Sequence, residues 1–176
     1  IARKLFPKVA QVIAGEADAK VRAQLVRALS RLGDPSQYLL VGKALKDQTE
    51  DVVVAAIEGL DVLASIDSIG LVEPFLNDAR PAVRAQAALA LWNQGEIRVS
   101  KRLAEGLDSG DESMVAGSLL ALNEILASLR RLEDSSKYVL LFSELKANLK
   151  SPDFVAYASK LKDVRVEAPV SQSRVF

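Results

Sequence analysis

The sequence predicts an all-α protein built as an array of helical hairpins, and three observations support this prediction. The 176-residue chain resembles itself when it is shifted by 31 residues. Within each unit, apolar residues recur at the spacing of one helix face, and turn-forming residues separate the periodic segments. Self-similarity at a fixed period of about 20 to 50 residues is typical of repeat arrays, so we expect about five hairpins and about ten helices.

The period is visible in columns of aligned residues. The stretch "VRAQ" occurs at residues 21–24 and again at 83–86, which is 62 residues or two periods later. Other positions hold small or apolar residues at the same spacing, and we expect these columns to form the core. They are Val21, Val52, Val83 and Met114; Leu29, Leu60, Leu91 and Leu122; Ala28, Gly59, Ala90 and Ala121; and Leu45, Leu76 and Leu107.

Each unit is expected to contain a longer and a shorter helix. The longer one has an apolar face with the i, i+4, i+7, i+8, i+11 spacing, which in the first unit consists of Val21, Leu25, Ala28, Leu29 and Leu32. The shorter one, over residues 39–46, repeats this pattern. Residues 33–35, residues 67–68 and Gly95 indicate turns, and Pro81 stands where a helix would begin.

We expect one repeat domain over residues 1–162, with irregular ends at 1–17 and 126–162 and an extended or disordered tail at 163–176. Residues 136–138 (Ser-Lys-Tyr) echo residues 36–38 (Ser-Gln-Tyr) at an offset of 100, which is seven more than three periods. An insertion of two helical turns near residues 125–133, lengthening the last regular helix, explains this offset. A final helix is expected over residues 154–161. Because the chain opens at Ile1 without a methionine or a signal segment, we expect it to be a piece of a longer protein.

Composition excludes several kinds of chemistry. The chain has no cysteine and no histidine, which removes disulfides, thiolate sites and the commonest general base and metal ligand. We therefore expect no metal, no cofactor and no enzymatic activity, and the lack of cysteine favours a reducing, cytoplasmic location. The apolar runs are far shorter than the roughly 18 residues that a transmembrane helix needs, so no membrane insertion is expected.

Charge is balanced overall but unevenly distributed. The chain has 23 basic and 23 acidic residues. Residues 1–46 carry nine basic and three acidic residues, residues 47–134 seven and sixteen, and residues 135–176 seven and four, giving +6, −9 and +3. Nucleic-acid binding depends on phosphate neutralisation, and acidic Asp51 and Glu58 follow directly on the basic end. A nucleic-acid partner is therefore not expected.

Two segments carry a family resemblance: "DAKVRAQLVRALSRLGDPSQYLLVGKALKD" (residues 18–47) and "DARPAVRAQAALALWNQGE" (residues 78–96). Both resemble the HEAT-like repeats of the phycobilisome-lyase type, over about residues 18–125, except that Val53 replaces the arginine of the pattern. The resemblance implies a right-handed α-α superhelix. Such repeats occur in bilin lyases, in a hydroxylase, in scaffolds and in appendages of transporters and regulators. The hydroxylase needs histidines for its di-iron centre, so this chain cannot share that activity.

The arginines of the two "VRAQ" stretches are expected to join neighbouring units. Arg22 and Arg84 each follow a valine of the core column, and the acids Asp47 and Asp78 lie in the loops between units. Guanidinium and carboxylate groups form bidentate pairs, so we predict a structural ion-pair ladder from these four residues.

The candidate binding residues lie on a stripe of the longer helix that varies from unit to unit. It comprises positions 20, 24, 27 and 31 and their equivalents, about 100° round from the apolar face, and the resemblance implies that it turns toward the concave surface of the superhelix. Trp92, one position before the stripe, either packs between units or anchors a partner. The candidate partner-binding residues are Lys20, Gln24, Arg27, Arg31, Glu58, Gln86, Leu89, Trp92, Asn93, Leu120 and Glu124.

These observations favour a non-catalytic interaction scaffold or regulatory module that binds a protein partner on its concave face. Two alternatives remain open. One is a bilin-lyase-like subunit or domain, although the stripe lacks histidine and cysteine. The other is a soluble regulatory domain of a membrane transporter.

Overall fold

The computed structural model describes residues 2–32, 34, 37–132 and 135–150. These residues form nine α-helices and three short 3-10 segments, with no strand among them, which confirms the predicted all-α class. The α-helices are α1 (Ala2–Gly15), α2 (Ala19–Arg31), α3 (Tyr38–Gly42), α4 (Glu50–Leu63), α5 (Ile69–Val72), α6 (Pro81–Asn93), α7 (Arg98–Leu107), α8 (Glu112–Leu132) and α9 (Ser135–Asn148). The helix expected at residues 154–161 and the tail at 163–176 lie outside the described residues.

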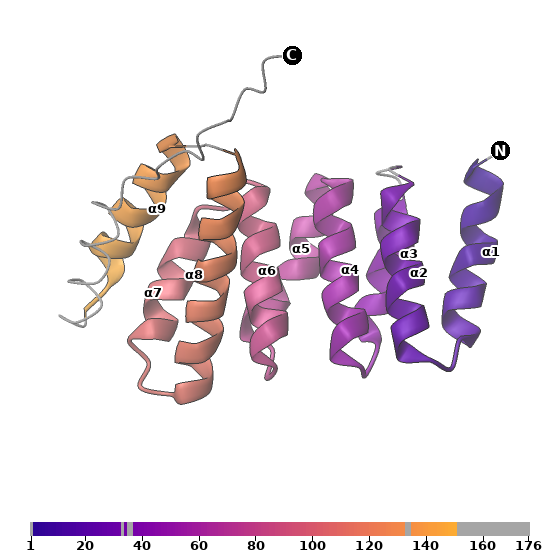
Figure 1. Ribbon diagram of the computed structural model, residues 1–176, viewed down its shortest axis with the longest axis horizontal. Helices are drawn as coiled ribbons and strands as arrows, with labels where there is room; N and C mark the ends of the chain where they lie inside the picture. The colour runs from indigo at the N-terminus through magenta and orange to yellow at the C-terminus, as the bar shows by residue number, and fades with distance from the viewer. Residues whose placement is uncertain (1, 33, 35–36, 133–134, 151–176) are drawn as a thin grey trace, which may run out of the picture.

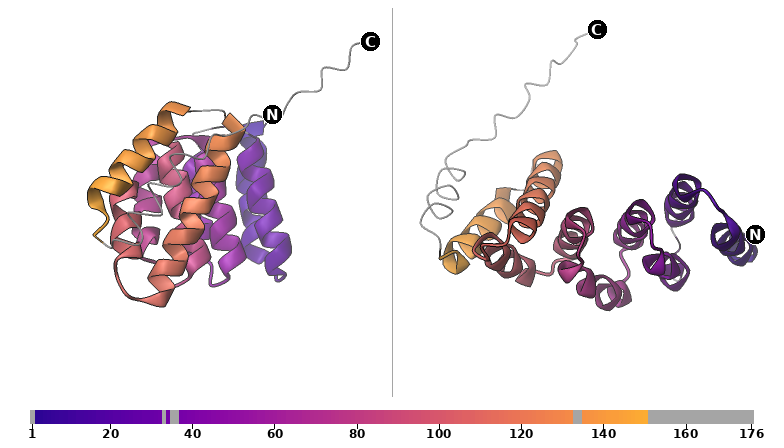
Figure 2. Two further views of the ribbon diagram at one scale, coloured as in Figure 1. Left: turned by 60° about the vertical axis from the view of Figure 1, so that its left-hand side comes forward. Right: turned by 90° about the horizontal axis from the view of Figure 1, so that it is seen from below.

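The helices stack side by side in two rows (Figures 1 and 2). One row consists of α2, α4, α6 and α8, in which α2 packs on α4, α4 on α6 and α6 on α8. The second row contains the shorter helical segments, with α7 packed on α9 at the C-terminal end. Seen from below, the rows follow a shallow arc with the α2-α4-α6-α8 row on its inner side (Figure 2). The described residues therefore form four consecutive hairpins, preceded by the helix α1.

The leucine column that the sequence predicts as core is buried in every unit. Leu29, Leu60, Leu91 and Leu122 are all less than a tenth exposed. Between units the helices approach closely because the facing residues are small. Gly59 of α4 lies against the side chain of Ser30 of α2, and a Cβ atom added at Gly59 would collide with the Ser30 hydroxyl. Burial of these columns between neighbouring hairpins is the main stabilising contribution in a repeat array.

The second half of the hairpins is less regular than expected. In the first complete unit, α3 continues into a 3-10 segment, η2 (Lys43–Lys46). In the next unit, α5 is flanked by the 3-10 segments η3 (Ile66–Ser68) and η4 (Glu73–Asn77). Pro74 near the start of η4 has no main-chain N–H group, so it cannot continue the α-helical hydrogen bonds. Only from α7 onward is the second element one continuous α-helix.

The turn that precedes each longer helix repeats with the 31-residue period. At four positions a polar side chain accepts a hydrogen bond from the main-chain N–H group two residues later. The pairs are Glu16 with Asp18, Asp47 with Thr49, Asp78 with Arg80, and Ser109 with Asp111. Such side-chain contacts fix the start of a helix by stabilising the non-helical residue before it.

Helix α8 confirms the predicted insertion. It contains 21 residues, whereas α2, α4 and α6 contain 13, 14 and 13. The seven or eight additional residues correspond to two helical turns. Pro81 is the first residue of α6, and Gly95 has a φ of 87° in the turn after α6, as the sequence predicts for both.

The predicted core face of α2 is wrong for most of its residues. Leu29 is buried, but Val21, Ala28 and Leu32 are exposed and Leu25 is half-buried. The other buried residues of α2 are Ala23, Val26 and Ser30, and Ser30 lies against Gly59 of α4. The prediction failed because this face would need a preceding helix of the α2-α4-α6-α8 row to cover it, as α2 covers α4, and among the described residues only α1, which lies in the second row, precedes α2.

Candidate interaction surface

The inner row of helices carries the stripe that the sequence singles out. The name inner stripe is used below for positions 20, 24, 27 and 31 of α2 together with the equivalent positions of α4, α6 and α8. The exposed members among the candidate residues are Lys20, Gln24, Arg31, Asn93, Leu120 and Glu124. Arg27, Glu58 and Gln86 are half-buried. The exposed members change from cationic on α2 to apolar and acidic on α8.

Two members of the inner stripe are tied to each other across neighbouring units. The Nε atom of Arg27 lies 2.7 Å from Oε2 of Glu58, one period later in the same column. Since both side chains are about one-third exposed, solvent weakens this ion pair and its contribution to stability is small. The pair partly neutralises the stripe at the α2–α4 boundary, which leaves Lys20 and Arg31 as the cations that a partner would meet on α2.

Leu89 and Trp92 are buried, which removes these two candidates from the surface. Trp92 is 4% exposed, in agreement with the packing interpretation of this residue. The reason is the position of α6, which lies between α4 and α8 and also contacts η4. Nine of its thirteen residues are buried, so its buried arc is much wider than that of α2.

A cavity lies beside the inner stripe at the C-terminal ends of α4 and α6. It has a volume of about 380 Å³ and is lined by Asp61, Ala64, Ile66, Ile69, Asn93 and Gln94. Asn93 donates a hydrogen bond to Asp61 over 2.7 Å, and burial raises the pKa of the Asp61 carboxyl above its usual range. The amide nitrogen of Gln94 is buried without a hydrogen-bond partner. Ile66 at the rim is 81% exposed. The cavity therefore combines polar groups with apolar walls, as ligand and peptide subsites do.

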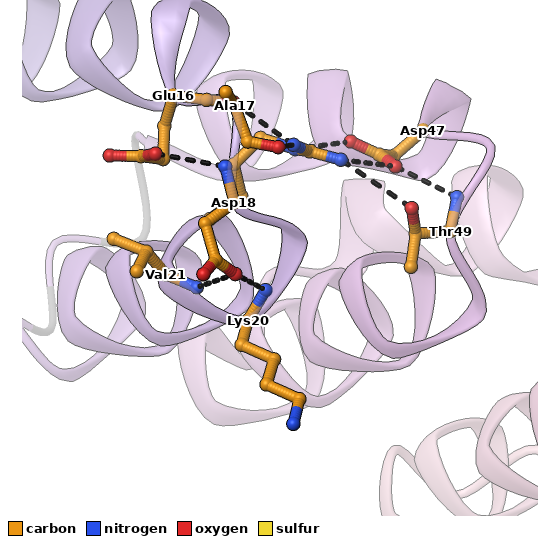
Figure 3. Close-up of polar contacts among 8 residues, drawn as sticks. Glu16, Ala17, Asp18, Lys20, Val21, Asp47 and Thr49 are labelled. Carbon is orange, nitrogen blue, oxygen red and sulfur yellow. Dashed lines mark hydrogen bonds and ion pairs between the residues drawn. The ribbon is translucent and has the colours of Figure 1, made fainter.

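Arg22 joins three segments of the chain. Its guanidinium forms a bidentate pair with Asp47, with Nε 2.9 Å from Oδ2 and Nη2 3.2 Å from Oδ1. Its Nη1 atom donates to the main-chain carbonyls of Glu16 and Ala17, each at 2.9 Å. Figure 3 shows the loop of Glu16 and Ala17 facing the loop of Asp47 and Thr49 across these bonds. The Arg22 hydrogen bond lowers the pKa of Asp47 below its usual range. This pair is the first rung of the expected ladder.

Arg84, in the second Val-Arg-Ala-Gln stretch, makes the same main-chain contacts as Arg22. None of its described hydrogen bonds goes to a carboxylate. Its Nη1 atom donates to the carbonyls of Asp78, at 2.5 Å, and Ala79, at 3.0 Å, which correspond to Glu16 and Ala17 two periods earlier. Its Nη2 atom donates to the carbonyl oxygen of Ser113 and, over 3.0 Å, to its hydroxyl. The expected ion pair between Arg84 and Asp78 is therefore replaced by hydrogen bonds to neutral oxygens.

The 31-residue register explains this difference. Arg22 pairs with the acid of the following loop, Asp47, and two periods later the equivalent loop residue is Ser109 rather than an acid. The register partner of Asp78 is Val53, which cannot form an ion pair. Asp78 instead pairs with Arg80 in its own loop, with both contacts at 2.8 Å, and this lowers the pKa of Asp78. Both exceptions, Ser109 in place of an acid and Val53 in place of an arginine, are visible in the sequence. The prediction missed their effect because it did not align the loop residues by the 31-residue period.

The sequence also contained a signal for the position of Arg84. Gly117 lies inside α8, in a column that otherwise holds Gln24, Ala55 and Gln86. A Cβ atom at Gly117 would lie 2.8 Å from Nε of Arg84, so only glycine leaves room for the guanidinium against α8. A glycine inside a helix lowers helix stability, so it indicates a close contact of this kind.

Within the described ranges, no cluster of three or more acidic residues could hold a metal ion. A second cavity, of about 390 Å³, lies between α1, α2 and η2. Apolar residues such as Ile13, Val26 and Val41 line it together with Lys43 and Lys46. Neither cavity brings together a nucleophile and a base.

Helix α8 is long and apolar enough to meet the length and composition test for a membrane span. The stretch Glu112–Leu129 has a mean hydropathy of 1.2. However, α8 occupies the same place in its unit as α2, α4 and α6, and it packs on α6 and α7. Its apolar residues are accounted for in part by this packing, with Ala121, Leu122 and Ile125 buried.

Comparison with known families agrees with this architecture. Residues 40–123 match a family described as HEAT repeats, so this part of the chain is similar to HEAT repeats. Such repeats typically serve as non-enzymatic scaffolds in protein–protein interaction. The matched segment runs from the second half of one hairpin through α4, α6 and α7 into α8. A search of curated proteins gives no match.

Proposed function

We propose that this protein is a non-catalytic interaction module that binds another protein along the inner stripe. The observation that carries the proposal is the cavity between the ends of α4 and α6, together with the exposed aliphatic residues near it. Val62, which belongs to the stripe, is 60% exposed, and Ile66 forms part of the cavity rim. Exposed apolar residues that surround a cavity with a few polar groups are typical of protein-binding sites.

The chemistry of the cavity defines what a partner would insert. Asp61 supplies a carboxylate, Gln94 supplies an amide nitrogen without a hydrogen-bond partner, and Ile66 and Ile69 supply apolar walls. A lysine or arginine side chain fits this combination, because its aliphatic stem can lie on the isoleucines while its charged end meets the carboxylate. On α2, Lys20 and Arg31 favour acidic residues of the partner. The partner segment is therefore expected to carry a basic residue at the cavity and acidic residues toward α2.

The experiment is capture of partners from the native lysate with immobilised protein, followed by identification by mass spectrometry. Arg31→Glu and Leu120→Asp change exposed residues of the inner stripe, and Asp61→Asn removes the cavity charge. We expect each variant to bind the captured partner with at least about tenfold lower affinity, because each substitution removes or reverses a contact of about 1.4 kcal/mol or more.

Matched controls lie on the opposite row of helices. Lys43→Glu and Leu39→Asp repeat the same kinds of substitution on exposed residues there and should leave binding unchanged. Circular dichroism would establish that all variants remain folded. The proposal is wrong if the stripe variants keep every partner, or if the control variants lose binding to the same degree.

A further inference from the structure

The cavity between α1, α2 and η2 lies at a place where the core of the next unit is filled. We call it the α1–η2 cavity; it has a volume of about 390 Å³ and also borders α3 and the start of α4. Four of its lining residues are smaller than the residues that the 31-residue period aligns with them. These pairs are Ala10 and Val41, Ala14 and Leu45, Val26 and Ile57, and Ala44 and Phe75. Among the lining residues of α1, only Ile13 is larger than its equivalent, Ala44.

The larger equivalents form closed core in the next unit. Val41, Leu45 and Ile57 are buried, and Phe75 packs against the same core. Protein interiors are close-packed, and an unfilled space of this size costs stability. The alanines of the first unit therefore leave open a space that the period would otherwise fill.

Positive charge is found at the same cavity. Lys43 and Lys46 line it and are exposed, and neither has an ion-pair partner in the part of the chain that the structure describes. One period later these positions hold Pro74 and Asn77. The carboxylate of Asp47 also lines the cavity, but it is already held by the guanidinium of Arg22 (Figure 3). The charge that remains without a partner at this cavity is therefore that of the two lysines.

We propose that the α1–η2 cavity binds an amphiphilic carboxylate, a small molecule with one aliphatic chain and one carboxylate group. The chain lies against Val26 and Ala44, in the space that corresponds to the position of Phe75 one period later. The carboxylate meets the ammonium groups at the cavity edge. An engineered apolar cavity of about 150 Å³ binds benzene, so the present cavity has room for a chain of roughly ten carbons.

Both parts of the ligand follow from the lining. Apolar walls with a few polar groups are typical of small-molecule sites, and burial of each methylene group of the chain favours binding. A cationic amphiphile of the same length would be repelled by the lysines. The cavity lies between α2 and the second row of helices, so this proposal does not rest on binding of a protein along the inner stripe.

Titration calorimetry with sodium decanoate tests the proposal on the 176-residue chain. We expect saturable binding of one decanoate per chain. Sodium butyrate, which lacks most of the aliphatic chain, should bind at least about tenfold more weakly, and so should decyltrimethylammonium, which reverses the charge. No saturable binding of decanoate, or equal binding of the two ten-carbon amphiphiles, would overturn the proposal.

Two substitutions fill the cavity with the residues of the next unit. Ala44→Phe reproduces Phe75, and Ala14→Leu reproduces Leu45. Each should weaken decanoate binding at least about tenfold and raise the melting temperature of the free protein, because the added apolar atoms occupy an existing space. The rise in melting temperature separates this result from loss of binding through misfolding. If both variants are folded and bind decanoate as the wild type does, the ligand lies elsewhere and the proposal is wrong.

A charge reversal tests the role of the lysines. Lys46→Glu should weaken decanoate binding by at least about threefold and should not weaken the binding of decyltrimethylammonium. Lys146→Glu is the matched control, because Lys146 is exposed on α9, 100 residues after Lys46, and does not line the cavity. It should leave both affinities unchanged, and equal effects of the two reversals would contradict a carboxylate site at Lys46. None of these measurements involves the inner stripe, so they can fail while the proposed function stands.

Discussion

The two copies of Val-Arg-Ala-Gln have identical sequences but different environments. Val83 is completely buried under α4, whereas Val21 is 42% exposed. Arg84 is buried and its hydrogen bonds go to main-chain carbonyls and a hydroxyl, whereas Arg22 is more exposed and forms an ion pair with Asp47. Gln24 is exposed and Gln86 is half-buried.

The difference shows that a repeated motif determines the local conformation but not the environment of its residues. Both arginines donate to the same two carbonyls of the preceding loop, so this local contact repeats. Burial of the valine depends on whether another helix of the α2-α4-α6-α8 row lies before its own, as α4 lies before α6. The partner of the arginine depends on the following loop, which offers Asp47 to one copy and no acid to the other. Substitutions made in parallel in the two copies therefore separate local from neighbour effects.

The largest difference is expected at the valines. Val83→Asp places an uncompensated carboxylate in the core and should destabilise the chain by roughly 3–5 kcal/mol or more. Val21→Asp should change stability by less than about 1 kcal/mol, because the side chain is partly solvated and lies in the first turn of α2, where a negative charge is favoured. Urea unfolding of the 176-residue chain measures both. Similar losses in the two variants would contradict the difference in burial.

The arginines should give the next largest difference. Arg84→Met leaves the carbonyls of Asp78, Ala79 and Ser113 without their donor in a buried position, at a cost of roughly 2–4 kcal/mol. Arg22→Met removes a more exposed group whose carbonyl partners water can reach, so its loss should be smaller.

Gly117 provides a check on the Arg84 measurement. In the wild type, Gly117→Ala should be unfavourable because its Cβ atom would contact the guanidinium. Combined with Arg84→Met, the same substitution should become stabilising by about 0.5–1 kcal/mol, since alanine favours the helix. Additive effects of the two substitutions would show that Arg84 does not lie against Gly117.

Features that depend on the period were predictable from the sequence. The leucine column, the helix start at Pro81 and the longer α8 follow from alignment of one unit with the next, since a residue's place in a repeat array is fixed by its place in the unit. The inner stripe could be selected in the same way, as the column where Lys20, Asp51, Ala82 and Ser113 differ.

Features that depend on the number of neighbours could not be predicted in this way. Trp92 and Leu89 are buried on α6, which packs on both α4 and α8, and Val21 is exposed because no helix of the same row precedes α2 among the described residues. The breaks in the second row also escaped prediction, because the energy difference between α-helical and 3-10 turns in short segments is small. The hydrogen bond from Arg84 to the Ser113 carbonyl could not be found from side-chain types alone, since every residue has a carbonyl oxygen.

The smallest expected difference between the two copies is in pH dependence. The hydrogen bond from Arg22 lowers the pKa of Asp47 in the folded protein, so the ionised carboxylate stabilises the fold above its unfolded pKa of about 3.9. This contribution is lost as the pH falls through the lowered folded value. The difference in unfolding free energy between wild type and Arg22→Met should therefore shrink in acid below about pH 4.

For Arg84→Met the difference should stay nearly constant over the same range, because carbonyl oxygens do not titrate and Arg84 affects the pKa of Asp78 only weakly. Denaturant titrations between about pH 3 and pH 7 measure both, and parallel curves would mean that the ion pair contributes nothing to the first copy.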